Sequence, residues 1–298
     1  MKEYIFIVNP IAGGGRALKA IPLIEGSCKE NRLSFQIILT EYTKHGTEIS
    51  SQFRDKDKVV VAVGGDGTVN ETLSGLVGSE AVLGILPFGS GNDIGSSFHI
   101  TPKNALDVIL QGYSKRFDVG KVNDKFFMGV ASCGFDTEVN RTANRIPRFI
   151  KDAPLYVLSI LITLISYQCK KLTIEFLDQI IEKEIMLLAV GHGDRYGGGM
   201  KITPNADRED GLFDLCLVSK VSKFELIRLI PKVFKGTHIT HPKVSNYKVP
   251  YLTIRGEGLV YADGEYKTEL PATYSIVPKA VNLLVPVPID VPDTNNNP

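Results

Sequence analysis

The chain contains 298 residues, which exceeds one ordinary hydrophobic core and predicts two domains of moderate size. Hydrophobic residues make up 43% of the chain and charged residues 22%, a composition typical of globular proteins that excludes a disordered chain. The 34 basic and 33 acidic residues leave a formal charge of +1, so no global basic excess indicates a nucleic-acid partner, and we expect none.

Two features bear on where the chain works. The cysteines at positions 28, 133, 169 and 216 match neither a C-x-x-C metal motif nor a short-loop disulfide framework, which favours reduced thiols and a cytoplasmic location. The longest apolar stretch, residues 153–165, is shorter than the roughly 20 residues that span a bilayer. We therefore expect no transmembrane helix.

The first third of the chain alternates apolar strands with helices. Strands are predicted at residues 4–8, 35–40, 58–63 and 82–86, and helices at 17–30 and 69–77. Continuous apolar strands that alternate with helices are typical of a parallel sheet covered on both faces. Such sheets bind ligands at the carboxyl ends of their strands, where this sequence places three glycine-rich turns.

After about residue 121 the pattern changes to short β-like runs separated by turn signals. The runs lie at residues 126–131, 171–177, 185–190, 212–218, 251–254 and 258–261. Helices are predicted among them at residues 154–167 and 223–234. The pattern indicates a second, mainly β domain, followed by a frayed polar tail at 290–298.

The glycine-rich turn at residues 64–68 (GGDGT) predicts a phosphate-binding site. Glycines let the backbone approach an anion closely, and the N–H groups at the start of the following helix attract negative charge. A plain strand–helix turn is the alternative, but it would not need three glycines around Asp66. The turn is not a Walker loop, because no lysine follows it, nor a dinucleotide fingerprint, because Asn70 stands where glycine or alanine is required.

A second turn, residues 89–93 (GSGND), offers backbone N–H groups, a hydroxyl at Ser90 and a carboxylate at Asp93. A carboxylate beside phosphates indicates a cation between them. The alternative is a helix cap formed by Asn92 or Asp93, and the residues alone leave both interpretations open.

Taken together, these turns resemble the motifs of the diacylglycerol kinase catalytic-domain family, which includes sphingosine and ceramide kinases. Residues 64–71 (GGDGTVNE) resemble its GGDGT-N-E signature, and residues 87–93 (PFGSGND) resemble its P-x-G-T-x-N-D turn. Further blocks of the family are matched in order at residues 9–13, 196–200, 204–213 and 263–265. The resemblance covers nearly the whole chain and points to the bacterial branch without membrane spans.

The resemblance implies an α/β nucleotide-binding domain, with a parallel sheet and flanking helices, and a mainly-β sandwich domain that receives the lipid. The chain end returns to the first domain, which predicts residues 1–121 with 279–298 as one domain and 122–278 as the other. In the family the active site lies between them. The implied reaction is ATP-dependent transfer of the γ-phosphate to a lipid hydroxyl, with diacylglycerol as the leading acceptor, during transient peripheral contact with a membrane. The sequence leaves the oligomeric state open, and a homodimer is compatible with it.

The implied cofactors are ATP and Mg²⁺. By resemblance, the nucleotide is bound by Asn9, Thr40, Gly64, Gly65, Asp66, Gly67, Thr68, Val69, Asn70, Ser90, Asn92 and Asp93. The family usually carries threonine where Ser90 stands, so the hydroxyl is kept.

The resemblance also assigns catalytic roles to two acidic residues. Glu265 matches the acidic residue that takes the proton from the attacking hydroxyl. From the sequence alone, Asp263-Gly264 could be a hairpin turn and Glu265 a solvated strand residue. Asp118 matches a residue of a magnesium–water network, and its alternative role is a cap at the domain linker.

A structural Mg²⁺ site of the bacterial branch maps onto Asp207, Asp210 and the backbone carbonyl of Leu212. Oxygen ligands in a turn suit a hard cation. The alternative is an acidic surface turn, which the residues alone favour.

Two features of the second domain bear on the lipid. The apolar residues 154–162 predict either a buried core helix, or else the wall of a lipid-tail pocket or a membrane-touching edge. The preceding Arg141, Arg145, Arg148 and Lys151 suit either anionic headgroups or a solvated loop. His192 stands where the family often carries asparagine, a departure that bears on acceptor recognition.

Two other functions compete with a lipid kinase. NAD kinase shares the GGDGT element, but the turn at residues 87–93, the DGE element at 263–265 and the apolar helix disfavour it. A nucleotide- or lipid-binding regulator without catalysis is disfavoured by the presence of Asp66, Ser90 and Glu265.

Overall fold

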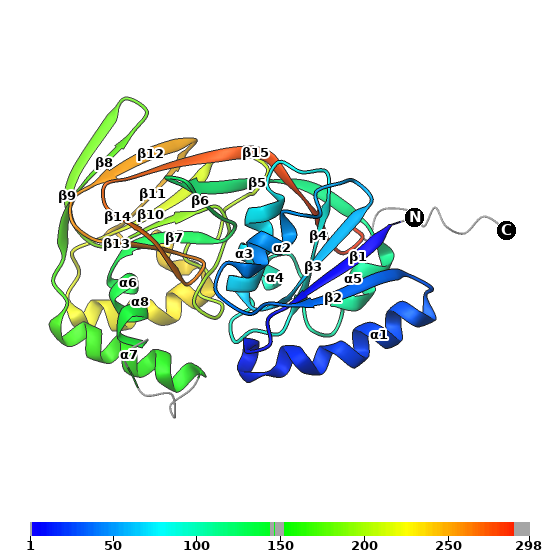
Figure 1. Ribbon diagram of the computed structural model, residues 1–298. Helices are drawn as coiled ribbons and strands as arrows, with labels where there is room; N and C mark the ends of the chain where they lie inside the picture. The colour runs from blue at the N-terminus through cyan, green and yellow to red at the C-terminus, as the bar shows by residue number, and fades with distance from the viewer. Residues whose placement is uncertain (1, 144–145, 147–151, 289–298) are drawn as a thin grey trace. The chain divides into compact units, whose positions relative to one another are not determined.

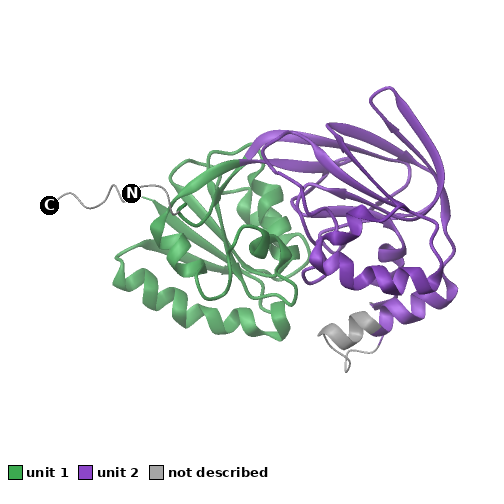
Figure 2. Cartoon of the chain, turned by 180° about the vertical axis from the view of Figure 1, so that it is seen from behind, with its two compact units in different colours: residues 1–116, 281–298 green, residues 117–280 purple. Residues whose placement is uncertain are grey.

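The computed structural model describes residues 2–143, 146 and 152–288 (Figure 1). It divides the chain into two compact units, unit 1 with residues 1–116 and 281–298 and unit 2 with residues 117–280 (Figure 2). The chain passes from one unit to the other within β5 (Ser114–Val122) and returns within β15 (Ala272–Leu284). The polar tail and three members of the basic cluster, Arg145, Arg148 and Lys151, lie outside the described residues.

Unit 1 contains the parallel sheet that the apolar runs predict. Its strands pair in the order β2-β1-β3-β4-β15, and all these pairs are parallel. The first four strands are β1 (Glu3–Val8), β2 (Ser34–Leu39), β3 (Lys58–Gly64) and β4 (Val82–Pro87). Side chains on both faces of β1, β3 and β4 are buried, as in a sheet covered by helices on both sides.

Unit 1 contains five α-helices among its described residues, and two of them begin at other residues than the sequence predicted. They are α1 (Ile21–Glu30), α2 (His45–Ser50), α3 (Asp66–Leu76), α4 (Asp93–Ser97) and α5 (Ala105–Gln111). The helix expected at 17–30 is a 3₁₀ turn, Arg16–Ala20, followed by α1, because Pro22 favours the first turn of a new helix. Helix α3 begins at Asp66, three residues earlier than expected, since Gly65 is extended and precedes it directly.

Unit 2 is built mainly from antiparallel strands. These are β6 (Lys125–Phe127), β7 (Val130–Gly134), β8 (Lys170–Phe176), β9 (Gln179–Gly191), β10 (Phe213–Ser219), β11 (Val244–Val249), β12 (Tyr251–Arg255), β13 (Leu259–Ala262) and β14 (Glu265–Glu269). They pair in the order β14-β13-β7-β9-β8-β12-β15, while β10 joins β9 to β11.

Alternating side chains on these strands build two cores in unit 2. On β10, Phe213, Leu215 and Leu217 enter a core formed between strands, whereas Cys216 and Val218 enter a second core beneath helices. The helices of the second core are α6 (Phe135–Ala143), α7 (Asp152–Ser166) and α8 (Lys223–Lys235), which gather on one side of the strands (Figure 1). The period-two pattern therefore specifies a β layer that is buried on both faces.

Helix α8 has well-defined ends. Ser222 and Glu225 form a capping box at its start, and Gly236 ends it in the left-handed conformation. Helix α7 has 15 residues and matches the apolar helix expected at 154–167. Within residues 2–143 and 152–288, no helix combines the length and hydropathy that crossing a membrane requires.

Candidate functional site

The predicted nucleotide residues of unit 1 gather at one edge of its sheet. Asn9, Thr40, Gly65 and Phe88 follow the ends of β1, β2, β3 and β4, and parallel strands end at the same edge. Asn9 Nδ2 donates a hydrogen bond to Thr68 Oγ1 over 3.2 Å. The N–H of Thr40 donates to the carbonyl of Val8 over 2.9 Å.

The two glycine-rich turns of this edge pack backbone against backbone. The N–H groups of Phe88 and Gly89 donate to the carbonyl of Gly64, over 2.7 and 3.1 Å. A Cβ atom at Gly89 would lie 2.3 Å from the Cα of Gly65, a distance too short for two carbon atoms that are not bonded. Glycine is therefore required here because the second turn touches the first, which is a reason that neither turn reveals alone.

Asp66 joins the two turns through its carboxylate. Oδ2 accepts a hydrogen bond from the N–H of Asp93 over 3.0 Å, and Oδ1 accepts one from the N–H of Ile94 over 2.9 Å. These N–H groups open helix α4, so Asp66 caps a helix that belongs to the other turn. Asn92 precedes α4 but does not cap it; its side chain instead exchanges hydrogen bonds of 2.8 and 3.0 Å with the backbone of Gly89.

The remaining predicted nucleotide residues differ in exposure. Ser90 is exposed on the second turn, and Gly67 is partly exposed in the first turn of α3. Thr68, Val69 and Asn70 are buried. Any nucleotide contact from Val69 would therefore use its backbone, whereas the hydroxyl of Ser90 faces solvent.

Glu265 begins the strand that follows a two-residue hairpin turn. Asp263 and Gly264 have φ values of 52° and 79°, and Ala262 pairs with Glu265 across them. The Asp263 carboxylate accepts the N–H groups of Met128 and Gly129, each over 2.9 Å, which ties the turn to the start of β7. Glu265 is partly exposed, and its carboxylate pairs with the ammonium of Lys267 over 3.1 Å at the start of β14.

Asp118 connects three segments of unit 2. Its Oδ1 accepts the N–H of Lys279 over 2.7 Å, and its Oδ2 accepts the N–H of Gly211 over 3.2 Å. Its backbone N–H donates to the carbonyl of Arg208 over 3.0 Å. Asp118 is buried, and in this arrangement its carboxylate positions the loop at residues 207–212; the predicted role in a magnesium–water network stays a prediction.

The loop at residues 207–212, predicted to bind a structural metal, is paired with a lysine of strand β11. Asp210 Oδ1 accepts the N–H of Leu212 over 2.9 Å, and Asp210 Oδ2 pairs with Lys248 Nζ over 2.7 Å. Lys248 also lies 3.4 Å from the Asp214 carboxylate. Across the described residues, no group of three histidine, cysteine, aspartate or glutamate side chains is arranged to hold a metal. Oxygen donors of this kind suit Mg²⁺, but the Lys248 ammonium already pairs with the Asp210 carboxylate, so the residues as arranged do not fit the ion. We derive no step through an ion at Asp207, Asp210 and Leu212.

His192 is a buried structural residue of unit 2. Its Nε2 lies 2.8 Å from the Asp118 carbonyl, which places the ring proton on Nε2, and its ring lies edge to face with that of Phe213. Burial, with a smaller contribution from the Arg208 charge, lowers the pKa of His192 to about 4. The imidazole is therefore neutral at physiological pH and supports the backbone of the strand that carries Asp118.

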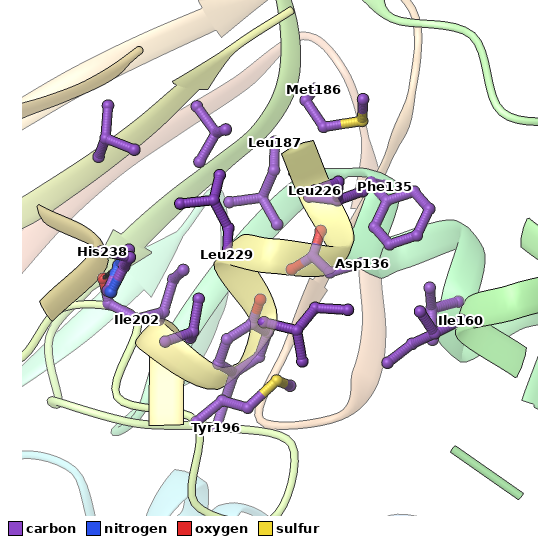
Figure 3. A pocket seen from close by; sticks show the side chains of 16 residues that line it. Phe135, Asp136, Ile160, Met186, Leu187, Tyr196, Ile202, Leu226, Leu229 and His238 are labelled. Carbon is purple, nitrogen blue, oxygen red and sulfur yellow. Dashed lines mark hydrogen bonds between the residues drawn. The ribbon is translucent and has the colours of Figure 1, made fainter. Parts of the chain in front are cut away.

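An apolar pocket lies beneath α8 (Figure 3), and Ile160 of the apolar segment that the sequence marked as a candidate pocket wall lines it. Its cavity volume is about 70 Å³, several times the roughly 10–15 Å³ that holds one water. Its walls include Phe135 and Asp136 of α6, Ile160 of α7, and Leu226 and Leu229 of α8. Tyr196, which begins the glycine turn at residues 196–200, also lines it.

Asp136 places a polar group in this apolar pocket. Burial raises the pKa of its carboxyl, against the opposing influence of the nearby hydroxyls of Ser132 and Tyr196. Phe135 and Asp136 directly follow the buried strand β7, and a carboxylate in that position is a second sequence signal that could have marked the pocket.

Comparisons with known proteins agree with this division of the chain. Residues 3–122 match the model of the diacylglycerol kinase catalytic domain, and residues 129–285 match that of the YegS C-terminal NAD kinase beta sandwich-like domain. A diacylglycerol kinase of Mycobacterium tuberculosis is 32% identical over 292 residues, which cover 94% of both chains. The chain belongs to the diacylglycerol kinase family. It is a lipid kinase with an α/β domain and a β-rich domain, as the motifs predicted.

Other relatives and structures extend this finding. A diacylglycerol kinase of Staphylococcus carnosus is 28% identical over 295 residues, covering 96% of this chain and 95% of its own. The fold is shared with a crystal structure of a candidate diacylglycerol kinase from Bacillus anthracis, with a TM-score of 0.75 and 23% identity over 96% of this chain and 98% of that one. In this lipid kinase, the edge of unit 1 and the Glu265 hairpin are each held by hydrogen bonds within their own unit.

Proposed function

We propose that this lipid kinase transfers the γ-phosphate of ATP to the free hydroxyl of diacylglycerol and so produces phosphatidic acid. The observation that carries the acceptor assignment is the apolar pocket of unit 2, in the unit that also holds Glu265. Phe135 and Asp136 of the pocket directly follow β7, and β7 pairs with the strand that precedes the Glu265 hairpin. The relatives named diacylglycerol kinases support the same acceptor.

The chemistry of the pocket favours a hydrocarbon chain over a dinucleotide. Its sixteen lining residues include no lysine or arginine, and Asp136 and His238 are the titratable groups other than tyrosine. The phosphates of NAD would need cationic or N–H-rich surroundings, whereas an acyl chain needs only apolar walls. The pocket therefore favours a lipid acceptor, and NAD is the alternative acceptor to include in the assay.

For the nucleotide, we propose the edge of unit 1. The turn at residues 64–68 opens helix α3, whose first N–H groups favour the phosphates of ATP. The second turn would add the hydroxyl of Ser90, and Asn9, Thr40, Asn92 and Asp93 would shape the same edge. Mg²⁺ bound with the nucleotide would neutralise charge on the transferring phosphoryl group.

The proposed reaction is a direct displacement. The lipid hydroxyl oxygen forms a bond to the γ-phosphorus while the bond from that phosphorus to the bridging oxygen of ADP breaks. Glu265 accepts the proton of the attacking hydroxyl, and the ion pair with Lys267 keeps its carboxylate in one orientation. The expected products are phosphatidic acid, ADP and a proton that Glu265 later releases to solvent.

The test is a kinase assay with purified protein, labelled ATP, Mg²⁺ and mixed micelles. Each micelle preparation contains diacylglycerol, phosphatidylglycerol, sphingosine or undecaprenol, and soluble NAD is assayed in parallel. Glu265→Gln should remove turnover while ATP binding persists. Glu269→Gln is the matched control, because Glu269 lies exposed on the same strand.

The outcomes separate the competing functions. Label in diacylglycerol that disappears in Glu265→Gln and persists in Glu269→Gln would support both the acceptor and the base. Label in another lipid alone would show that this lipid, and not diacylglycerol, is the acceptor. Label in NAD alone would show that the acceptor is NAD and not a lipid. ATP binding without turnover on any acceptor would instead favour the regulator.

A further inference from the structure

Helix α8 carries apolar side chains both on the face that lines the pocket and on its exposed surface. Leu226, Leu229, Ile230 and Val233 face inward and line the apolar pocket. Phe224, Ile227, Pro231 and Phe234 recur at intervals of three, four and three residues and are exposed. A surface helix normally needs only one apolar face, so the outer stripe requires a separate explanation.

The end of α7 continues this outer surface. Leu161, Ile162 and Ile165 are exposed, and the Lys223 ammonium donates a hydrogen bond to the carbonyl of Ile165, which joins the start of α8 to α7. The six large apolar side chains of the two helices are 43–75% exposed. We call Leu161, Ile162, Ile165, Phe224, Ile227 and Phe234 the α7–α8 surface.

Positive charges flank this surface. Arg228, Lys232 and Lys235 are exposed, and each directly follows a member of the outer stripe of α8. The acidic residue of α8, Glu225, is engaged by Lys243 over 2.8 Å and lies 3.6 Å from His241. Arg228 lies over the Phe224 ring, 4.2 Å from its centroid, and no carboxylate among the described residues forms an ion pair with these three cations. Cations beside exposed aromatic and aliphatic side chains suit anionic headgroups above acyl chains.

We propose that the α7–α8 surface docks on the face of an anionic lipid bilayer. The inference rests on the proposed lipid acceptor and identifies where the enzyme meets the membrane that contains it. Because the inner faces of the same helices line the apolar pocket, docking would put that pocket one helix away from the acyl region of the bilayer. Self-association through this surface is disfavoured, because the three cations of one copy would face and repel the three cations of the other.

The test measures binding to vesicles by flotation, with phosphatidylglycerol vesicles compared with phosphatidylcholine vesicles. The variant F224S/I227S/F234S removes the apolar stripe, and R228Q/K232Q/K235Q removes the cations. Ile180→Ser is the control, because Ile180 is 70% exposed at the β8–β9 hairpin of the same unit. The wild type and the control should bind anionic vesicles, and loss of three cations should weaken binding about 100-fold.

A second measurement separates docking from catalysis. All variants are assayed with a short-chain diacylglycerol dissolved below its micelle concentration. Docking variants should keep the wild-type rate on this soluble acceptor and lose activity on vesicles. If the wild type phosphorylates the soluble lipid but binds vesicles no better than the apolar-stripe variant does, the docking inference is wrong and the proposed function stands.

The remaining outcomes are equally distinct. Absence of turnover on the soluble lipid by the wild type would overturn the proposed function regardless of vesicle binding. A change in the mass of the apolar-stripe variant in solution, without a change in vesicle binding, would assign the surface to self-association and overturn the docking inference.

Discussion

The carboxylate of Asp66 connects the two glycine-rich turns of unit 1 by accepting the N–H of Asp93 over 3.0 Å. The two residues lie 27 positions apart, and each belongs to a separate family motif. Their hydrogen bond, with the companion bond to Ile94, means that the GGDGT turn and the GSGND turn form one rigid element rather than two independent phosphate contacts.

Replacing Asp66 with asparagine should therefore disturb the second turn as well as the first. Hydrogen bonds to a charged acceptor contribute about 1.5–3 kcal/mol, and the amide keeps only one acceptor oxygen. We expect ATP to bind about tenfold more weakly to Asp66→Asn, measured by titration calorimetry. Asp57→Asn, at an exposed position of the same unit, should bind ATP normally. Unchanged affinity in Asp66→Asn would mean that the two turns are held together by other contacts.

Gly89 should tolerate no side chain. A Cβ atom there would lie 2.3 Å from the Cα of Gly65 and 3.0 Å from Asn92 Oδ1, so the two turns would have to separate. We expect Gly89→Ala to lower stability by about 1–3 kcal/mol and to weaken ATP binding. Gly26→Ala is the control, since nothing lies within 4 Å of its added Cβ and alanine favours α1. Equal ATP affinities of the two variants would contradict the close approach of the turns.

His192 should make stability depend on pH. The unfolded chain binds a proton at this residue below its ordinary pKa of 6.5, whereas the folded protein binds one only below about 4. Stability should therefore fall as the pH decreases from 6.5 to 4, by up to about 3 kcal/mol from this residue, and should not depend on it above 6.5.

The measurement is a series of denaturant titrations between pH 4 and pH 8. His192→Asn should flatten the curve in the acidic range, while His99→Asn, at an exposed position, should follow the wild type. Other buried carboxyls, such as Asp136, are common to all three proteins and cancel in the comparison. Parallel curves for the wild type and His192→Asn would show that His192 does not remain neutral when buried.

The sequence predicted correctly that the glycine-rich turns lie at the carboxyl ends of the parallel strands, because local signals there coincide. Apolar runs end in glycine-rich turns, and the structure has β1 to β4 ending at the same edge. The strands β11 and β14 were missed because their exposed faces carry polar residues, as in VSNYKV, and such short alternating runs resemble loops. Of the pocket walls, the sequence marked only the apolar helix that carries Ile160. The other walls were missed because they come from segments as distant as Phe135 and Val244, which only packing brings together.

The loop at residues 207–212 has a charged partner that the local sequence could not predict. The residue types there predicted a magnesium site, but Lys248, 38 positions beyond Asp210, pairs with that carboxylate over 2.7 Å. Nothing in the pattern around Asp210 marks this partner. The side-chain hydrogen bond to Asp210 and the Asp214 charge raise the pKa of Lys248, so a charged ammonium lies beside both carboxylates.

Removing Lys248 should turn this loop into a divalent-cation site. In Lys248→Gln, the carboxylates of Asp210 and Asp214 lose their shared counter-charge and repel each other. We expect the variant to melt at a lower temperature than the wild type in EDTA and to recover with Mg²⁺, because oxygen ligands in a turn suit a hard cation. The wild type, without nucleotide, should melt at the same temperature in EDTA and in Mg²⁺. A wild type that Mg²⁺ stabilises as strongly as the variant would show that the ion displaces Lys248, and would restore the site predicted at Asp207, Asp210 and Leu212.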